Sequence, residues 1–310
     1  MLKKKIWIPG SAGMLGQAIL KNIDKKKYQV FKTTKKQINL FNKTKIENFI
    51  KKNNIKEIIL CASKVGGIHA NNTFPADFLL DNLNIQNNIF QLSIKNKIKK
   101  LTFIGSSCIY PKKNKIPIKE EYLLTGPLEQ TNYAYAIAKI AGVKAVQSIN
   151  QQYKTNYKAA MMTNMYGPND NFNLKTSHVI PALIRKFYEA KLNKKNNVEI
   201  WGSGKPLRDV LYVDDAARAI LIYHEKKNDH NIINIGSGYE MTIKKMAQII
   251  GNIIGYEGKI IFNSRYPDGT YRKMLDISKI KRLGWSPKVD FKTGISHTLE
   301  WYRQTNDKFK

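Results

Sequence analysis

A glycine-rich turn close to the N-terminus constrains the fold more than any other feature of this chain. Gly10, Gly13 and Gly16 have the spacing G-x-x-G-x-x-G, directly after the apolar run at residues 6–9 and directly before a helical pattern. The first glycines permit a tight turn and let the backbone approach a pyrophosphate, and the third lets the helix pack closely on a sheet. The helix N-terminus then faces the phosphate with its positive dipole end. The motif predicts a dinucleotide-binding strand, turn and helix.

Short apolar runs alternate with helical patterns through the first half of the chain. This alternation is typical of an α/β fold with a Rossmann-type, doubly wound parallel sheet. Strands are predicted at residues 6–9, 28–32, 57–62, 101–105 and 157–162, and helices at 14–22, 43–53, 75–96 and 132–153. The less regular second half predicts helices at 179–190, 214–223 and 242–254 and a strand at 231–235.

These patterns predict two structural parts along the chain. We expect residues 1–165 to form the dinucleotide-binding Rossmann domain, with later segments such as 208–236 returning to it. We expect residues 166–310 to form mainly a smaller α/β substrate-binding lobe.

Composition excludes several classes of protein. Two cysteines, Cys61 and Cys108, in 310 residues make no disulfide framework, and no His or Cys motif suggests a metal. No apolar run reaches the roughly 18–20 residues of a membrane span, and residues 1–10 lack the features of a signal peptide. We therefore expect a cytoplasmic protein with no metal and no membrane partner.

The formal net charge of +30 raises a remote alternative, a basic nucleic-acid-binding protein on a Rossmann scaffold. However, the lysines are spread along the whole chain, and only seven of the 53 basic residues are arginine. Lys, Asn and Ile are abundant together, which is the pattern that an AT-rich genome produces. We therefore predict no nucleic-acid partner. A basic surface still attracts anionic substrates such as nucleotides.

The end of the second predicted strand indicates the cofactor. An NAD site usually places Asp or Glu there to bind the ribose 2′-hydroxyl. Residues 31–36 read Phe-Lys-Thr-Thr-Lys-Lys and contain no acid. Lysines would attract a 2′-phosphate, so the segment favours NADP(H), with Lys35 as a contact. The alternative is that these are ordinary lysines in a lysine-rich chain.

A tyrosine and a lysine four residues apart indicate the chemistry. Tyr135 and Lys139 share one helical face, and a nearby lysine stabilises a phenolate and lowers the tyrosine pKa. Tyr133 is excluded because Ile137 stands four residues after it. Ser106 follows a predicted strand, and strand ends of this kind of sheet converge on one site. Ser106 and Tyr135 can then bind a carbonyl oxygen together.

The glycine loop, the strand-end serine and Y-x-x-x-K together resemble the extended short-chain dehydrogenase/reductase family. Longer strings resemble the GDP-L-fucose synthases of that family along almost the whole chain: residues 62–68, 75–78, 105–111, 131–132, 135–139, 166–172, 177–182, 212–215, 267–270 and 283–285.

The resemblance implies an epimerase/reductase. Such an enzyme epimerises carbons 3 and 5 of GDP-4-keto-6-deoxy-mannose and reduces its C4 ketone with NADPH. Cys108 would be the epimerisation base and His178 its acid partner, with Ser106 and Tyr135 holding the enolate oxygen. In an extended segment Ser106 and Cys108 would also point to the same side. The alternatives are a buried structural cysteine and a satisfied loop histidine.

The resemblance also implies the binding residues. Cofactor contacts are expected from Gly10, Ser11, Ala12, Gly13, Met14, Leu15, Gly16, Lys35, Ile104, Gly105, Ser106, Ser107, Tyr135, Lys139, Met162, Thr163, Asn164, Met165 and His178. Substrate contacts are expected from Ser106, Cys108, Asn164, Lys186, Trp201, Arg208 and Asp268. Trp201 could instead be a core aromatic. Cys61 matches no catalytic position, and we expect it in the core.

Several departures from the family pattern leave the sugar open. The family usually has Arg at Lys186, Pro at Ala134, Met162 and Tyr271, and often a basic residue at Ala12. A second hypothesis is therefore a C4 reductase of a GDP-4-keto-6-deoxy-heptose or related sugar, with little or no epimerase activity. Members of the family commonly form homodimers through two long helices, here at 75–96 and 132–153, so a homodimer is expected.

Overall fold

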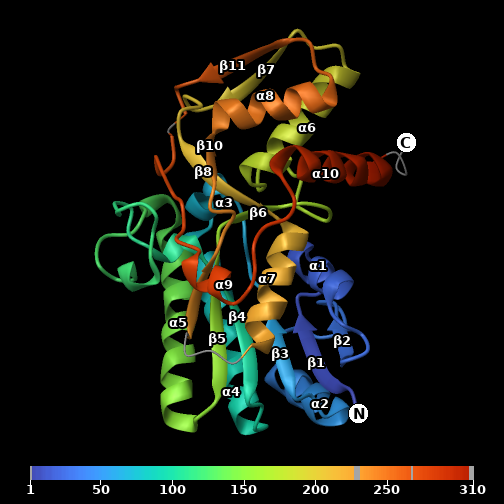
Figure 1. Cartoon of the computed structure of the whole chain (residues 1–310), viewed down its shortest axis with the longest axis vertical. Coiled ribbons are helices and arrows are strands. Elements are labelled where there is room, and N and C mark those ends of the chain that lie inside the picture. The colour runs from blue at the N-terminus through green and yellow to red at the C-terminus, as the bar shows by residue number, and fades with distance from the viewer. Residues whose placement is uncertain (1, 227–230, 267, 307–310) are drawn as a thin grey trace.

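The centre of the computed structural model is a parallel sheet with helices on both faces (Figure 1). The structure describes residues 2–226, 231–266 and 268–306. Each neighbouring pair of strands in the main sheet is parallel. In spatial order the strands are β2 (Tyr28–Thr33), β1 (Lys4–Pro9), β3 (Glu57–Leu60), β4 (Lys100–Ser106), β5 (Asn156–Met162) and β9 (Ile232–Ile235). The predicted fold class is confirmed.

The strand order determines where a ligand binds. The chain runs outward from β1 to β2 on one side and from β3 onward on the other. In sheets of this kind ligands bind beyond the carboxyl ends of the strands at such a switch point. The glycine loop, which follows β1, and Cys61, which follows β3, lie at this edge.

Helices cover the sheet because its strands are apolar on both faces. Ile58, Ile59 and Leu60 of β3 are all buried, as expected for a strand between two helical layers. Figure 1 shows α4 beside α5, and α7 near α1. The covering helices are α1 (Met14–Asn22), α2 (Lys43–Asn53), α4 (Pro75–Lys95), α5 (Tyr133–Tyr153) and α7 (Val213–Glu225).

Local signals set the ends of these helices. The Asn42 side chain accepts a hydrogen bond from the Lys45 amide at 2.9 Å and so caps the start of α2. Asn54 adopts the left-handed conformation at its end, with φ of 51°. The predicted helices at 14–22 and 43–53 therefore coincide with α1 and α2.

A second hydrophobic cluster forms the upper part of the molecule in Figure 1. Its helices are α6 (Val179–Leu192), α8 (Ile243–Ile254) and α10 (Phe291–Asn306). Its strands are β6 (Asn164–Tyr166), β8 (Leu207–Tyr212) and β10 (Glu240–Thr242) in one sheet, and β7 (Asn197–Trp201) and β11 (Lys259–Asn263) in another. Sequence patterns predicted α6 and α8 here, but not the strands or α10.

Short helices connect the larger elements near the carboxyl edge of the main sheet. They are α3 (Ile68–Thr73), the 3₁₀ helices η1 (Ser107–Ile109), η2 (Glu120–Tyr122) and η3 (Gln130–Asn132), and α9 (Ser278–Arg282). None of the helices within the described ranges is long and apolar enough to span a membrane.

A buried polar cluster lies at the opposite, amino-terminal edge of the sheet. The His224 ring bonds the Thr102 hydroxyl through Nδ1 at 2.8 Å and Glu57 Oε2 through Nε2 at 3.0 Å. Lys4 and Lys100 approach the same carboxylate at 3.6 and 3.5 Å. The cluster therefore joins β1, β3, β4 and α7.

Candidate active site

The glycine loop leaves no room for side chains at two of its three glycines. A Cβ on Gly10, whose φ is +85°, would lie 2.4 Å from the Ala62 backbone nitrogen. A Cβ on Gly16 would lie 2.3 Å from the Gly10 carbonyl oxygen, whereas one on Gly13 would meet only that oxygen, at 3.6 Å. Gly13 precedes α1 and provides no side-chain cap. The amides of the first turn are therefore available to an anion, as a pyrophosphate site requires.

The end of β2 is fastened to this loop. Ser11 Oγ donates to the Thr33 carbonyl oxygen and accepts from the Thr33 amide, both at 3.2 Å. Thr33 Oγ1 also accepts from Trp7 Nε1 at 3.1 Å. Lys32 and Lys35 are exposed beside this junction, which contains no carboxylate. The local charge therefore suits the 2′-phosphate of NADP(H).

Tyr135 lies among three partners from different elements. Its hydroxyl lies close to the side chains of Ser106, at the end of β4, and Ser63, after β3, and interacts electrostatically with both. Its ring packs edge-on against Phe78 of α4, with centroids 6.3 Å apart. The predicted pairing of Ser106 with Tyr135 is therefore present in the geometry, and Ser63 is an additional neighbour that sequence patterns did not indicate.

Lys139 lies beneath this tyrosine without bonding its hydroxyl. Its Nζ donates to the Ile104 carbonyl oxygen at 2.8 Å and lies 5.7 Å from the centre of the Tyr135 ring. Burial lowers the pKa of Lys139 to about 7, against the opposing charges of Cys61 and Cys108. Burial raises the pKa of Tyr135, and the charge of Cys108 adds to this.

The expectation that lysine lowers the pKa of Tyr135 is therefore wrong for this structure. The ammonium group is aimed at a backbone carbonyl, and desolvation outweighs its distant charge. Tyr135 is consequently a protonated phenol at neutral pH. That is the form a proton donor needs.

Cys108 lies one turn beyond Ser106, but the segment is not extended as expected. It forms η1, in which the Cys108 amide donates to Ser106 Oγ at 3.3 Å. Asn132 Nδ2 donates to Cys108 Sγ at 3.1 Å, and Lys273 Nζ lies 3.8 Å from the same sulfur. Cys108 also interacts electrostatically with Tyr135 and Arg208. The local hydrogen bond, not strand alternation, keeps Cys108 beside Ser106.

His178 stands directly before α6, so its imidazole belongs to the loop that precedes this helix. The side chain is reached by solvent, yet the surrounding protein lowers the pKa of the imidazole by desolvation. Among the described residues, no hydrogen bond or ion pair joins His178 to Cys108. The predicted acid partner thus lies in the loop before α6 and, among the described residues, is not bonded to the predicted base.

Two aromatic rings and a lysine form a surface in the second cluster. Trp201 stacks on Tyr266 with centroids 4.3 Å apart and an interplanar angle of 15°. Lys186 Nζ lies 5.2 Å from the Trp201 ring and donates to the Glu199 carbonyl oxygen at 2.9 Å. Trp201 is 49% exposed, so it is not a core aromatic. Its stacking face suits a planar ring.

Arg208 connects this surface with Cys108. Its guanidinium donates to the carbonyl oxygens of Leu207 and Thr270 at 2.8 and 2.7 Å. Burial lowers its pKa, opposed by the charges of Asp268 and Cys108. Asp268 accepts from the Ser203 amide and hydroxyl at 2.9 and 2.6 Å. The predicted contacts Arg208 and Asp268 are therefore neighbours, whereas Pro267 of the quoted motif lies outside the described residues.

The remaining predicted contacts follow β5. Thr163 Oγ1 donates to the Asp209 carbonyl oxygen at 2.8 Å, and the Thr163 amide donates to Ile235 at 3.0 Å. Asn164 and Met165 continue into β6, where Asn164 pairs with Val210 of β8. This loop therefore joins the two sheets beside the catalytic strand ends. Cys61 packs partly buried against the main core, as expected.

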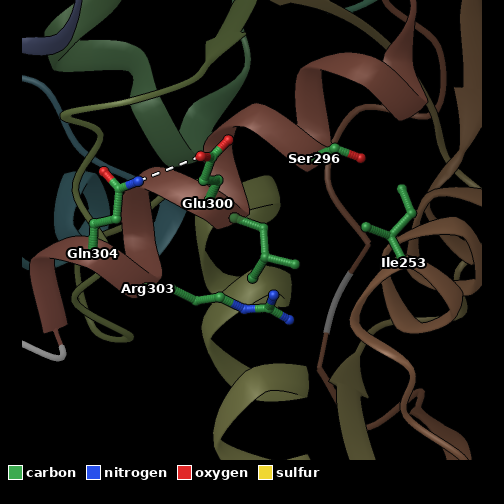
Figure 2. A pocket seen from close by; sticks show the side chains of 6 residues that line it. Ile253, Ser296, Glu300, Arg303 and Gln304 are labelled. Atoms are coloured by element: carbon green, nitrogen blue, oxygen red, sulfur yellow. Dashed lines mark hydrogen bonds between the residues drawn. The ribbon is translucent and has the colours of Figure 1, made fainter.

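Two hollows lie elsewhere on the surface. A cavity of 390 Å³ opens between α8 and α10 and is lined by Ile253, Ser296, Leu299, Glu300, Arg303 and Gln304 (Figure 2). It includes no predicted site residue. A cavity of 230 Å³ lies beside the start of α5 and is lined by Asn71, Asn72, Pro75, Gln130, Thr131, Tyr133 and Ala134. Within the described ranges, no cluster of three or more His, Cys, Asp or Glu side chains could hold a metal ion.

Comparison with known proteins decides the family. The model of the NAD dependent epimerase/dehydratase family matches residues 6–236. The chain belongs to the NAD dependent epimerase/dehydratase family. This confirms the prediction of a nicotinamide-dependent enzyme.

Relatives within the epimerase/dehydratase family resemble the chain over nearly its full length. GDP-L-fucose synthase 1 from Arabidopsis thaliana is 45% identical and the match covers 96% of this chain and 93% of the relative. A GDP-6-OMe-4-keto-L-xylo-heptose reductase from C. jejuni is 35% identical, with a TM-score of 0.90 and 99% coverage of both chains. A GDP-mannoheptose C4 reductase from Campylobacter jejuni with NADP bound is 36% identical, with a TM-score of 0.85 and coverage of 98% and 99%. The resemblance to GDP-L-fucose synthases is confirmed, and the NADP(H) prediction agrees with the last structure.

Three residues that lie beside Tyr135 or Cys108 were not predicted as site residues: Ser63, Asn132 and Lys273. Asn132 precedes Tyr135 by three residues and belongs to a quoted motif, so proximity could have indicated it. Ser63 follows β3 and could have been found as another strand-end hydroxyl. Lys273 has no local signal, because a fold contact between distant segments brings it to Cys108.

Proposed function

We propose that the chain reduces the C4 ketone of a GDP-linked 4-keto-6-deoxy sugar with NADPH, after epimerising carbons 3 and 5. One observation carries the proposal: Ser106, Tyr135 and Cys108 meet beside Arg208. Arg208 faces Asp268, which bonds Ser203, two residues after the exposed Trp201. Carbonyl chemistry is thus next to a cation for a pyrophosphate and an aromatic face for a base. The GDP-L-fucose synthase activity named for the Arabidopsis relative supports it.

The glycine loop, the basic end of β2 and Lys139 would hold the cofactor. When bound, NADPH supplies the hydride. Tyr135 then gives its phenolic proton to the ketone oxygen, while Ser106 donates a hydrogen bond to that oxygen. Before reduction, Cys108 would remove the proton from a carbon beside the ketone and His178 would return one from the other face.

A second candidate is a C4 reductase of a GDP-4-keto-6-deoxy-heptose or related sugar, with little or no epimerase activity. Both Campylobacter structures are named as reductases of GDP-linked heptoses, which favours this candidate.

A substrate screen in heavy water tests both candidates. Purified protein is given GDP-4-keto-6-deoxy-mannose or a GDP-4-keto-6-deoxy-heptose, with NADPH or NADH, and oxidation and label are followed. Deuterium at carbons 3 and 5 supports the epimerase/reductase. Reduction of a pre-epimerised sugar without label supports the reductase alone. Salt-dependent nucleic-acid binding with no turnover of any sugar would support the remote nucleic-acid alternative.

We further propose a cytoplasmic homodimer that forms through α4 and α5. These helices pack side by side at one flank of the molecule (Figure 1). Exposed positions on α4 include Leu80, Asn84 and Asn87, which are uncharged in a chain of net charge +30. Two copies of so basic a chain meet with least repulsion where uncharged side chains are exposed.

Analytical ultracentrifugation tests the dimer. Leu80→Lys should shift the protein toward monomer, while Leu192→Lys, at another exposed position, should not. A wild-type monomer at micromolar concentration would contradict the proposal.

A further inference from the structure

Two donors from distant parts of the chain meet at one sulfur atom. Asn132 Nδ2 lies 3.1 Å from Cys108 Sγ, and Lys273 Nζ lies 3.8 Å from it. An ammonium group can only donate, so the sulfur is the acceptor in that contact. Asn132 contacts the sulfur through its amide nitrogen, which is also a donor, so the sulfur is the acceptor in this contact too. Both groups can donate in the same way to a thiolate, which is the form that accepts a proton.

The backbone around Lys273 holds it in place. On one side the Leu207 amide donates to the Tyr271 carbonyl oxygen at 2.8 Å. On the other the Ile118 amide donates to the Met274 carbonyl oxygen at 2.8 Å. Within the described part of the chain, no carboxylate forms an ion pair with Lys273. The positive charge that its Nζ brings to Cys108 is therefore not neutralised by an acidic side chain.

Asn132 is held in a similar way by its position. It ends η3 and directly precedes α5, the helix that carries Tyr135. Among the described residues, its buried Oδ1 has no hydrogen-bond partner, and the side-chain amide donates only to the Cys108 sulfur. A buried polar atom left unpartnered is costly, and such a cost is typical of functional sites.

The wider electrostatic surroundings of Cys108 agree with this. Arg208, Lys139 and Tyr135 interact electrostatically with it, and Lys273 contacts it. None of these four groups is a carboxylate, and three are cationic when protonated. Arg208, Lys139 and Lys273 thus bring cationic groups toward the sulfur from several elements.

We propose that Asn132 and Lys273 are positioning residues that hold Cys108 as the thiolate base for proton abstraction beside the substrate ketone. This inference rests on the proposed epimerase/reductase function. In the step, the carbon–hydrogen bond breaks as an S–H bond forms on Cys108. The electron pair of the broken bond moves toward the ketone oxygen, which becomes the enolate oxygen held by Ser106 and Tyr135.

Alkylation tests the donor pair without any sugar nucleotide. In a Cys61→Ser background Cys108 is the remaining thiol, and its rate of reaction with iodoacetamide is measured from pH 6 to 9. Lys273→Met should slow alkylation about tenfold at pH 7, and Asn132→Ala should slow it about threefold. Lys273→Arg should restore most of the rate. Lys281→Met, a change at an exposed lysine of α9, is the matched control and should leave the rate unchanged.

Turnover provides the second measurement. With a GDP-4-keto sugar in heavy water, Lys273→Met should lower deuterium uptake at carbons 3 and 5 about tenfold. The same variant should reduce a pre-epimerised ketone with nearly wild-type kcat.

Two results would overturn the inference. One is an alkylation rate unchanged in both Lys273→Met and Asn132→Ala. The other is a raised KM for the sugar nucleotide with unchanged alkylation, which would make Lys273 a substrate contact instead. If no GDP-4-keto sugar is turned over, the proposed function fails, but the alkylation rates still decide whether the pair stabilises the thiolate.

Discussion

At the scale of single residues, the proposed reduction depends on one phenolic proton. Burial raises the pKa of Tyr135, so the hydroxyl remains protonated while the enzyme works near neutral pH. Tyr135→Phe should therefore reduce NADPH oxidation by about 10²–10⁴-fold, the contribution of a positioned acid. NADPH affinity, measured by fluorescence titration, should change little because the ring and its packing on Phe78 remain. Oxidation at close to the wild-type rate would remove Tyr135 from the mechanism.

Lys139 makes the pH dependence informative. Its pKa is lowered from 10.5 to about 7 by burial, so the ammonium fraction falls as pH rises through 7. If that charge helps to bind the cofactor, kcat/KM for NADPH should decline above about pH 7. Lys139→Arg keeps the charge and should move this decline to higher pH.

A decline near pH 7 that persists in Lys139→Arg would assign the titration to another group. Ionisation of His178 would not explain such a decline, because desolvation lowers its pKa below the ordinary value of 6.5.

Site residues could be predicted from sequence where a local pattern carries them, as with Ser106 at a strand end and Tyr135 and Lys139 on one helical face. The pKa of Tyr135 could not, because it depends on which way the Lys139 amine points and on burial by other elements. Lys273 also could not, since 165 residues separate it from Cys108.

At the scale of elements, the strand, loop and helix at the N-terminus form one packed unit. A methyl group at Gly16 would lie 2.3 Å from the Gly10 carbonyl oxygen, and backbone atoms there have no room to move. Gly16→Ala should therefore destabilise the protein by about 1–3 kcal/mol. At Gly13 the nearest atom would be 3.6 Å away, so Gly13→Ala should leave thermal stability nearly unchanged. Equal melting temperatures for the two variants would contradict this account of the loop.

Elements with strong periodicity or clear caps were predictable, whereas short paired strands were not. Asn42 and Asn54 mark the ends of α2 in the sequence itself. By contrast, β7 and β11 exist because Trp201 pairs with Asn263, and β6 has three residues held by β8. Such strands depend on partners far along the chain, which local patterns do not report. The expected extended run through Cys108 failed for a related reason, since the hydrogen bond to Ser106 Oγ favours a 3₁₀ turn.

At the scale of the whole molecule, the residues of the site and the net positive charge both favour binding of an anionic nucleotide sugar. Strand β4 and helix α5 supply Ser106 and Tyr135, while later segments supply Arg208 and Lys273. The net charge of +30 favours encounter with an anionic nucleotide sugar, and the cations that face Cys108 direct that charge to the site. The same surplus makes folding more sensitive to acid, because protonation adds further positive charge.

The polar cluster beneath the sheet predicts how stability responds to acid. Burial lowers the pKa of His224 to about 4, partly offset by its hydrogen bond to Glu57. Burial opposes ionisation of Glu57, but His224 and the nearby lysines outweigh it and lower the pKa of Glu57 to about 2. These two lowered pKa values fit a neutral imidazole whose Nε2 donates to the Glu57 carboxylate and whose Nδ1 accepts from the Thr102 hydroxyl.

The sign of the effect follows from proton uptake. The unfolded chain protonates His224 near its ordinary pKa of 6.5, and the folded chain near 4, so stability falls as pH drops between these values. From pH 7 to pH 5 this histidine should remove roughly 2 kcal/mol of the free energy of unfolding. His224→Gln retains a donor for Glu57 but does not titrate, so its stability should fall less over the same range by about that amount. Urea denaturation at both pH values measures the difference, with His297→Gln, at an exposed histidine, as the control. Parallel losses in wild type and His224→Gln would show that acid acts on the fold through other groups.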